Sequence, residues 1–220
     1  MLTKTQGIVL RYTRFGDTSI ILNVFTEAFG VQSYMVKGVR KAQKSSRMAL
    51  FQPLTLLEIV THHRETSQVQ HLKEVKCSYI FRNIHGDVRR ESLAYFITEI
   101  LNRTIREVDD PSPLYQFLEQ QLVALDQQQD ALADFHLHFL MGYAQTLGFG
   151  AAVPEDITSG MSADVRLYNI LELLIRGDRN LRLNADERRE ILTVLLNFLR
   201  RHAGDFGQLK SLSVLRNLLA

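Results

Sequence analysis

The hydrophobic pattern of this chain changes its period once, close to residue 76, and that change constrains the fold more than any other feature. Before it, short apolar runs have a period of two, so that Ile20, Leu22 and Val24 share one face of a strand. After it, apolar residues recur at spacings of three and four, the period of an amphipathic helix. The sequence therefore predicts a β-rich domain over 1–77 and an all-helical domain over 78–220.

Five strand-like segments precede the change of period, and turn signals such as Phe15-Gly16-Asp17 separate them. They span residues 7–12, 20–25, 31–36, 54–60 and 69–75. Five short strands suit a small barrel, and the OB-fold is the five-stranded barrel best known for holding nucleic acid. An SH3-like barrel would have nearly the same pattern, so the periodicity does not choose between the two.

Six helices are expected in the second part of the chain. They span residues 91–106, 113–125, 131–147, 163–176, 185–202 and 210–219. Ser112 and Asn184 are expected to act as N-caps, and Gly148 and Gly177 to end helices. We expect residues 149–163 to form a linker. The predicted fold class is α+β, a five-stranded OB-fold barrel followed by an all-helical domain.

The net charge of +2 becomes informative once it is divided along the chain. Residues 1–50 hold eight basic and two acidic side chains, a balance of +6. Because the whole chain carries +2, the remaining residues have a balance of −4. Such an asymmetry indicates a partner that is a polyanion. A solvated positive face without any partner is the alternative.

The segment from Lys37 to Arg47 carries five of these basic residues and no acidic one. We expect it to be an exposed loop between two strands that follows a phosphate backbone through charge. A solubilising loop is the alternative. Arg11 and Arg14, at the end of the first strand, are expected to extend the same DNA-binding surface. The predicted DNA contacts are Arg11, Arg14, Lys37, Arg40, Lys41, Lys44 and Arg47.

Single-strand binders usually add exposed rings on which bases stack. Tyr12 and Phe15 are the preferred candidates because they flank Arg14 in a turn.

Neither catalysis nor metal binding has support in the sequence. The single cysteine, Cys77, excludes a multi-cysteine zinc site, and His136 and His138 point to different faces of a helix. Phosphate loops of the Walker type, nucleophile elbows and carboxylate clusters do not occur. We therefore expect a non-enzymatic protein without a cofactor. No run of about 18 apolar residues occurs, which predicts a cytoplasmic location without membrane contact.

Several short motifs resemble the bacterial recombination and repair mediator RecO. At the N-terminus these are Gly7 to Leu10, Gly16 to Ser19, Phe25-Thr26, Gly30 and Lys37 to Arg40. In the second half, residues 135–150 (FHLHFLMGYAQTLGFG) and 209–219 (LKSLSVLRNLL) are similar to two helices of the family. The resemblance spans nearly the whole chain in order, which makes it more specific than any one motif.

This resemblance implies an OB-fold, binding of single- and double-stranded DNA, and annealing of complementary strands. It further implies that RecA is loaded together with RecR onto DNA coated by single-strand-binding protein, whose C-terminal tail is an expected partner at the nucleoid. Lys37, Arg40 and Lys41 fall on the family's basic barrel surface. A four-cysteine zinc element of some relatives is absent here, and His138 stands where some have arginine, so the contact for the tail is not placed.

A second function fits the charge equally well. A protein-interaction adaptor could bind an acidic peptide through the basic barrel and scaffold other proteins through its helical domain.

Overall fold

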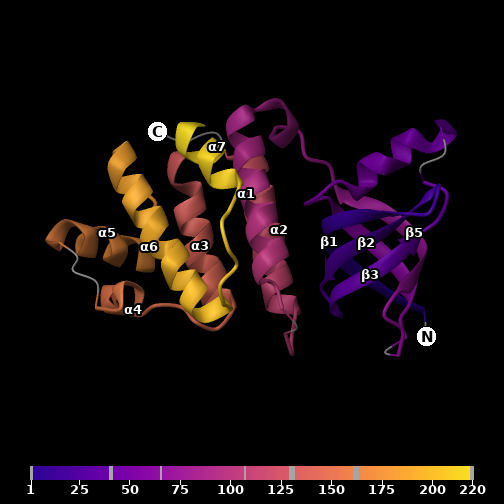
Figure 1. The fold of residues 1–220 in the computed structure, drawn as a ribbon, viewed down its shortest axis with the longest axis horizontal. Helices are drawn as coiled ribbons and strands as arrows, with labels where there is room; N and C mark the ends of the chain where they lie inside the picture. Colours follow the sequence, from indigo (N-terminus) through magenta and orange to yellow (C-terminus); the bar gives the residue numbers. More distant parts are fainter. Residues whose placement is uncertain are drawn as a thin grey trace. The chain divides into compact units, whose positions relative to one another are not determined.

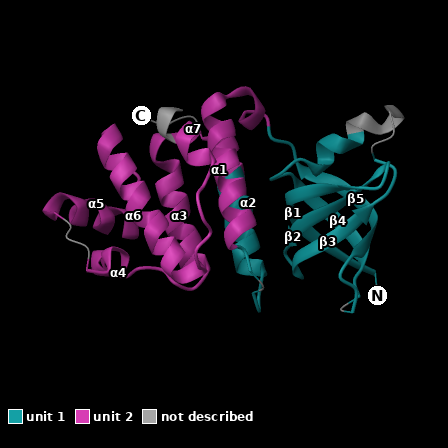
Figure 2. Cartoon of the chain, in the orientation of Figure 1, with its two compact units in different colours: residues 1–81, 105–122 teal, residues 82–104, 123–220 magenta. Residues whose placement is uncertain are grey.

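The computed structural model describes residues 2–39, 42–64, 66–106, 108–128, 132–160 and 164–218, with the backbone alone at 42–46 and 216–218. The chain divides into two compact units, distinguished in Figure 2. The first comprises residues 1–81 and 105–122, and the second comprises 82–104 and 123–220. The predicted boundary between the barrel domain (1–77) and the helical domain (78–220) stays a prediction.

The first unit contains five strands that close into a barrel (Figure 1). They are β1 (Leu2–Phe15), β2 (Ser19–Thr26), β3 (Gly30–Val36), β4 (Leu56–His62) and β5 (Gln70–Tyr79). Their order is β1-β2-β3-β5-β4, with β3 and β5 parallel and the other neighbours antiparallel. This order selects the OB-fold over an SH3-like barrel. The predicted fold class is confirmed.

The barrel interior follows the predicted alternation. Ile20, Leu22 and Val24 are fully buried in its core, whereas Ile21 and Asn23 between them are half-buried on the outer surface. Successive side chains of a strand point to opposite faces, so one face of β2 builds the core and the other faces outward.

One region of the outer surface is nevertheless covered. Ile8 pairs with Phe25 on β2 and with Leu56 on β4, and all three side chains are fully buried although they point away from the barrel core. In the same unit, the Ser112 hydroxyl donates to Glu27 Oε1 at 3.3 Å, which joins the start of helix α2 (Ser112–Gln127) to the turn after β2. The covered row is therefore not available to a ligand.

The connection between β3 and β4 differs from the exposed loop that we predicted. A 3-10 helix, η1 (Ala42–Phe51), occupies most of it. Val39 and Phe51 are fully buried in the barrel core, and Met48 packs against that core. The prediction of a wholly exposed loop was wrong because the apolar residues of the segment close one end of the barrel. Arg40 and Lys41 lie outside the described residues.

All six predicted helices are present, with one further short helix. They are α1 (Val88–Thr104), α2 (Ser112–Gln127), α3 (Phe135–Thr146), α4 (Pro154–Thr158), α5 (Val165–Ile175), α6 (Ala185–Ala203) and α7 (Ser211–Leu218), with the 3-10 turns η2 (Ile84–Gly86) and η3 (Leu132–Asp134). Helix α4 lies within the segment that we expected to be a linker. Asn184 caps α6 as predicted, whereas Ser112 is already the first residue of α2.

Two carboxylates stabilise the second unit by accepting backbone hydrogen bonds. Asp126 is 1% exposed and accepts hydrogen bonds from the backbone N–H groups of residues 82, 83 and 84. Glu99 on α1 accepts the backbone N–H groups of Lys210 and Ser211 at the start of α7. Burial opposes ionisation of Glu99, but these hydrogen bonds prevail and lower the pKa of Glu99. Both carboxylates thus satisfy backbone donors from distant parts of the sequence.

Candidate nucleic-acid interface

The outer face of β1, β2 and β3 forms the first part of the candidate interface. Strand pairing aligns Arg11 with Asn23 and Asn23 with Ser33, so these three residues form one row across the sheet. The next row contains the half-buried apolar pair Ile21 and Met35. The face thus combines a guanidinium, two polar side chains and an apolar surface against which a base can lie. We call these five residues the outer face.

Two further predicted contacts lie toward the barrel end that η1 closes. Strand pairing aligns Arg14 with Ile20 and Ile20 with Val36, and Lys37 directly follows Val36. Both Arg14 and Lys37 are exposed. The strand register therefore brings together cations that lie more than 20 residues apart in the sequence.

The remaining predicted contacts fall in or before η1. Arg47 is half-buried on this helix, and Lys44 is described by its backbone alone. Nothing in the structure tests whether any of the seven residues contacts DNA, and their assignment stays a prediction.

The described basic side chains of this set have no counter-charge. Within the ranges given above, no ion pair forms at Arg11, Arg14, Lys37 or Arg47. By contrast, Arg188 in the second unit lies 2.6 Å from Asp134. A cation without a carboxylate partner keeps its whole charge for a phosphate group. Arg103 and Arg176 of the second unit are likewise held in ion pairs, with Glu99 and Glu172.

The barrel surface also contains one partly neutralised cluster. Lys4 and Lys76 each lie 2.7 Å from Glu58, and their hydrogen bonds hold the pKa of Glu58 below its usual value. Two cations and one anion leave a single net positive charge at this place.

The two candidate aromatic side chains have different environments. Phe15 is 49% exposed at the end of β1, as expected. Tyr12 is half-buried: it pairs with the fully buried Leu22 and packs against the barrel core, so it presents less of its ring to a base than Phe15 does. A β-bulge between Val9 and Arg11 interrupts the alternation, so that Tyr12 faces the same core as Val9.

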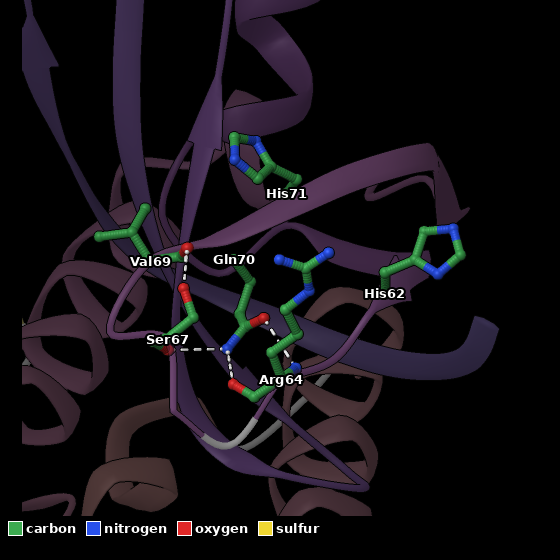
Figure 3. Close-up of a pocket in the computed structure, with 6 residues that line it drawn as sticks. All are labelled: His62, Arg64, Ser67, Val69, Gln70 and His71. Carbon is green, nitrogen blue, oxygen red and sulfur yellow. Dashed lines mark hydrogen bonds between the residues drawn. The ribbon is translucent and has the colours of Figure 1, made fainter. Parts of the chain in front are cut away.

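A hollow at the connection between β4 and β5 was not found from the sequence. Its volume is about 390 Å³, and its lining is His62, Arg64, Ser67, Val69, Gln70 and His71 (Figure 3). Gln70 is 2% exposed and holds the connection: its side-chain N–H group donates to the carbonyl oxygens of Arg64 and Ser67, both at 2.8 Å. Three histidines and one arginine near one turn were the available signal, but we interpreted the histidines as scattered.

Other kinds of site find no support in the part of the chain that the structure describes. It contains no group of three or more histidine, cysteine, aspartate or glutamate side chains placed to hold a metal ion. Within the same residues, no helix is long and apolar enough to span a membrane.

Comparison with known sequences covers nearly the whole chain. Residues 1–81 match the family described as "Recombination protein O N terminal", and residues 85–170 match "Recombination protein O C terminal". The chain is 32% identical over 241 residues to the DNA repair protein RecO of Phocaeicola vulgatus, and that alignment covers 100% of both chains. It is 30% identical to RecO of Flavobacterium psychrophilum, with 100% of both covered, and 31% identical to RecO of Bacteroides fragilis, with 99% of both covered.

Proposed function

The chain belongs to the RecO family of recombination proteins, and on that premise we propose that it binds and anneals DNA strands as a non-enzymatic mediator. A role in DNA repair follows from the family itself. The observation that supports DNA binding is the set of basic side chains on the barrel that lack a counter-charge, because phosphate groups would be their natural partners.

Annealing requires that two phosphate backbones approach each other. Cations on the barrel would neutralise part of that charge and lower the repulsion between complementary strands. The contacts in this proposal are Arg11, Arg14, Lys37, Arg40, Lys41, Lys44 and Arg47. They read no sequence, since contacts with phosphate carry no base information. The proposal therefore includes both single- and double-stranded DNA as ligands.

Protein partners complete the proposal. We propose that the protein acts with RecR and with the C-terminal tail of single-strand-binding protein to load RecA, in the cytoplasm at the nucleoid. The helical residues after 77 are the proposed partner-binding part. Their basic side chains include several that are already paired, such as Arg90 with Asp87 at 2.5 Å, which leaves less free charge for DNA.

The dependence of single-strand binding on salt tests this function. The five cations of the segment from Lys37 to Arg47 alone predict a slope of log K against log salt of about −3.5, so that a fourfold rise in salt weakens binding about a hundredfold. Replacing four of these five cations with alanine should make the slope less steep by about 2.8. That variant changes Arg40, Lys41, Lys44 and Arg47.

A matched control removes four exposed cations from elsewhere in the chain and should keep the wild-type slope. It changes Lys73, Arg89, Arg179 and Arg182 to alanine. A wild-type slope in the first variant would refute the assignment to this segment. Failure of the wild-type protein to accelerate annealing of two complementary oligonucleotides at low salt, with acidic peptides bound instead, would favour the adaptor function.

A further inference from the structure

The hollow between β4 and β5 is shaped by the protein's own hydrogen bonds. Besides the two bonds from its N–H group, Gln70 accepts the backbone N–H of Arg64 through Oε1 at 3.1 Å. The Ser67 hydroxyl donates to the carbonyl oxygen of Val69 at 2.8 Å, and its backbone N–H donates to that of Arg64 at 3.1 Å. These backbone groups are thus satisfied without a ligand, so the hollow is formed in advance.

The side chains that rim the hollow are available to a ligand. His62, Arg64 and His71 are exposed, and within the described ranges none of their side chains forms a hydrogen bond or an ion pair. Figure 3 shows Arg64 beside Gln70, with His71 and His62 at the margins. Val69 adds a half-buried apolar surface. One cation, two flat rings and an apolar wall are the groups that recognise a phosphate and a base.

The hollow continues the outer face of the barrel. His71 pairs directly with Met35 across the parallel strands β3 and β5, and Met35 pairs with Ile21. The connection is also fixed at its start, because the ring of His63 stacks on Phe29 with centroids 3.9 Å apart. A DNA strand that lies on the outer face across β2 and β3 would therefore reach the hollow along a continuous surface.

We propose that this hollow holds one unpaired nucleotide of single-stranded DNA, with Arg64 on the phosphate and the ring of His71 against the base. The proposal rests on the DNA-binding function proposed above and deepens it by assigning a preference for single strands. The volume of about 390 Å³ falls within the range of pockets that enclose small ligands. A base within a duplex is stacked and paired, so it would have to leave the helix to enter.

An acidic peptide is the less suitable occupant. It would use Arg64, but it would leave the flat faces of His62 and His71 without a matching surface. Bases of every kind present such a surface, which is why stacking tolerates any sequence.

Fluorescence anisotropy with two labelled probes, dT20 and a 20-base-pair duplex, tests the proposal. His71→Ala is expected to weaken binding to dT20 at least about fivefold, the lower end of the range for one lost stacking contact, and to leave duplex binding within about twofold. Arg64→Ala should reduce the salt slope on dT20 by about 0.7, whereas Arg64→Lys should keep it.

Lys73→Ala is the matched control, because this exposed cation lies two residues beyond His71 on β5 but does not line the hollow. It should change the affinity for both probes by the same factor. Thermal unfolding of each variant checks that the barrel is intact.

The outcomes separate the two proposals. A wild-type protein that binds neither probe would refute the DNA-binding function itself. If the wild type binds both probes but His71→Ala weakens both equally or neither, the nucleotide site is wrong and DNA binding stands. Loss of binding to a poly-glutamate peptide in Arg64→Ala, with dT20 binding unchanged, would also overturn the site, in favour of the acidic peptide.

Discussion

Replacing the buried His136 should make the helical unit less sensitive to acid. His136 lies on α3 with 2% of its surface exposed, its ring edge-on to Phe96, and its Nδ1 atom has no hydrogen-bond partner within the described residues. Burial lowers the pKa of His136 from 6.5 to about 3, with further contributions from Arg188 and His138. The folded protein therefore keeps this imidazole neutral where an unfolded chain would protonate it.

The sign and size of the effect follow from this difference. Above pH 6.5 the imidazole is neutral in both states, and the folded state is not penalised. As the pH falls below 6.5, the unfolded chain binds a proton that the folded one excludes until about pH 3, so stability is lost across that window. Between pH 7.5 and 5.5 the loss due to this one group is about 1.4 kcal/mol.

Urea unfolding of the wild type and of His136→Leu, followed by circular dichroism at 222 nm, measures this loss. The signal reports mainly the second unit, because it contains α1 and α3 to α7. The wild type should lose about 1.4 kcal/mol more than the variant between the two pH values. His138→Gln should reduce the loss by less, because burial also lowers the pKa of His138 but its side chain is only half-buried.

Equal pH dependence of the wild type and His136→Leu would refute the reasoning. It would mean that His136 reaches solvent or a proton acceptor in the folded state. A larger loss in the variant would have the wrong sign and would contradict the role of burial.

Two further predictions concern stability. Asp126→Ala should lower the free energy of unfolding by about 2–4 kcal/mol, seen as a lower urea midpoint, because three backbone N–H groups lose their acceptor; an unchanged midpoint would show that water replaces it. Gly7→Ala should cost about 1–3 kcal/mol in thermal unfolding, because a Cβ atom there would lie 2.6 Å from Val24 Cγ1. Gly86→Ala is the control, since nothing lies within 4 Å of its added Cβ, and equal losses in both variants would contradict the packing argument.

Much of the fold was predictable because burial leaves a local period in the sequence. The five strands and six helices each have an apolar face that can be read from a few neighbouring residues. The N-cap at Asn184 was predictable for the same reason, since a cap acts within three residues of itself: Asn184 Oδ1 accepts the N–H groups of Asp186 and Glu187. The concentration of positive charge in residues 1–50 is likewise a property of the sequence alone.

The features that could not be predicted depended on what each residue meets across the fold. Tyr12 packs against the core because a β-bulge places it opposite Leu22, and Val39 is buried because its segment closes the barrel. Neither fact can be read from neighbouring residues. A basic segment with two apolar residues is predicted to be wholly exposed from its own composition. Only the tertiary structure shows that the segment lies at the open end of a barrel, where an apolar residue can be buried.

The sequence by itself determined the two structural classes, the helix and strand positions and the charge asymmetry, because each depends on residues close together in the chain. Only the tertiary structure decided the strand order, the covered row at Ile8, Phe25 and Leu56, and the hollow at Gln70. These depend on contacts between residues far apart in the sequence, such as Tyr34 with Gln70, and the period of a strand carries no information about which strand will lie beside it.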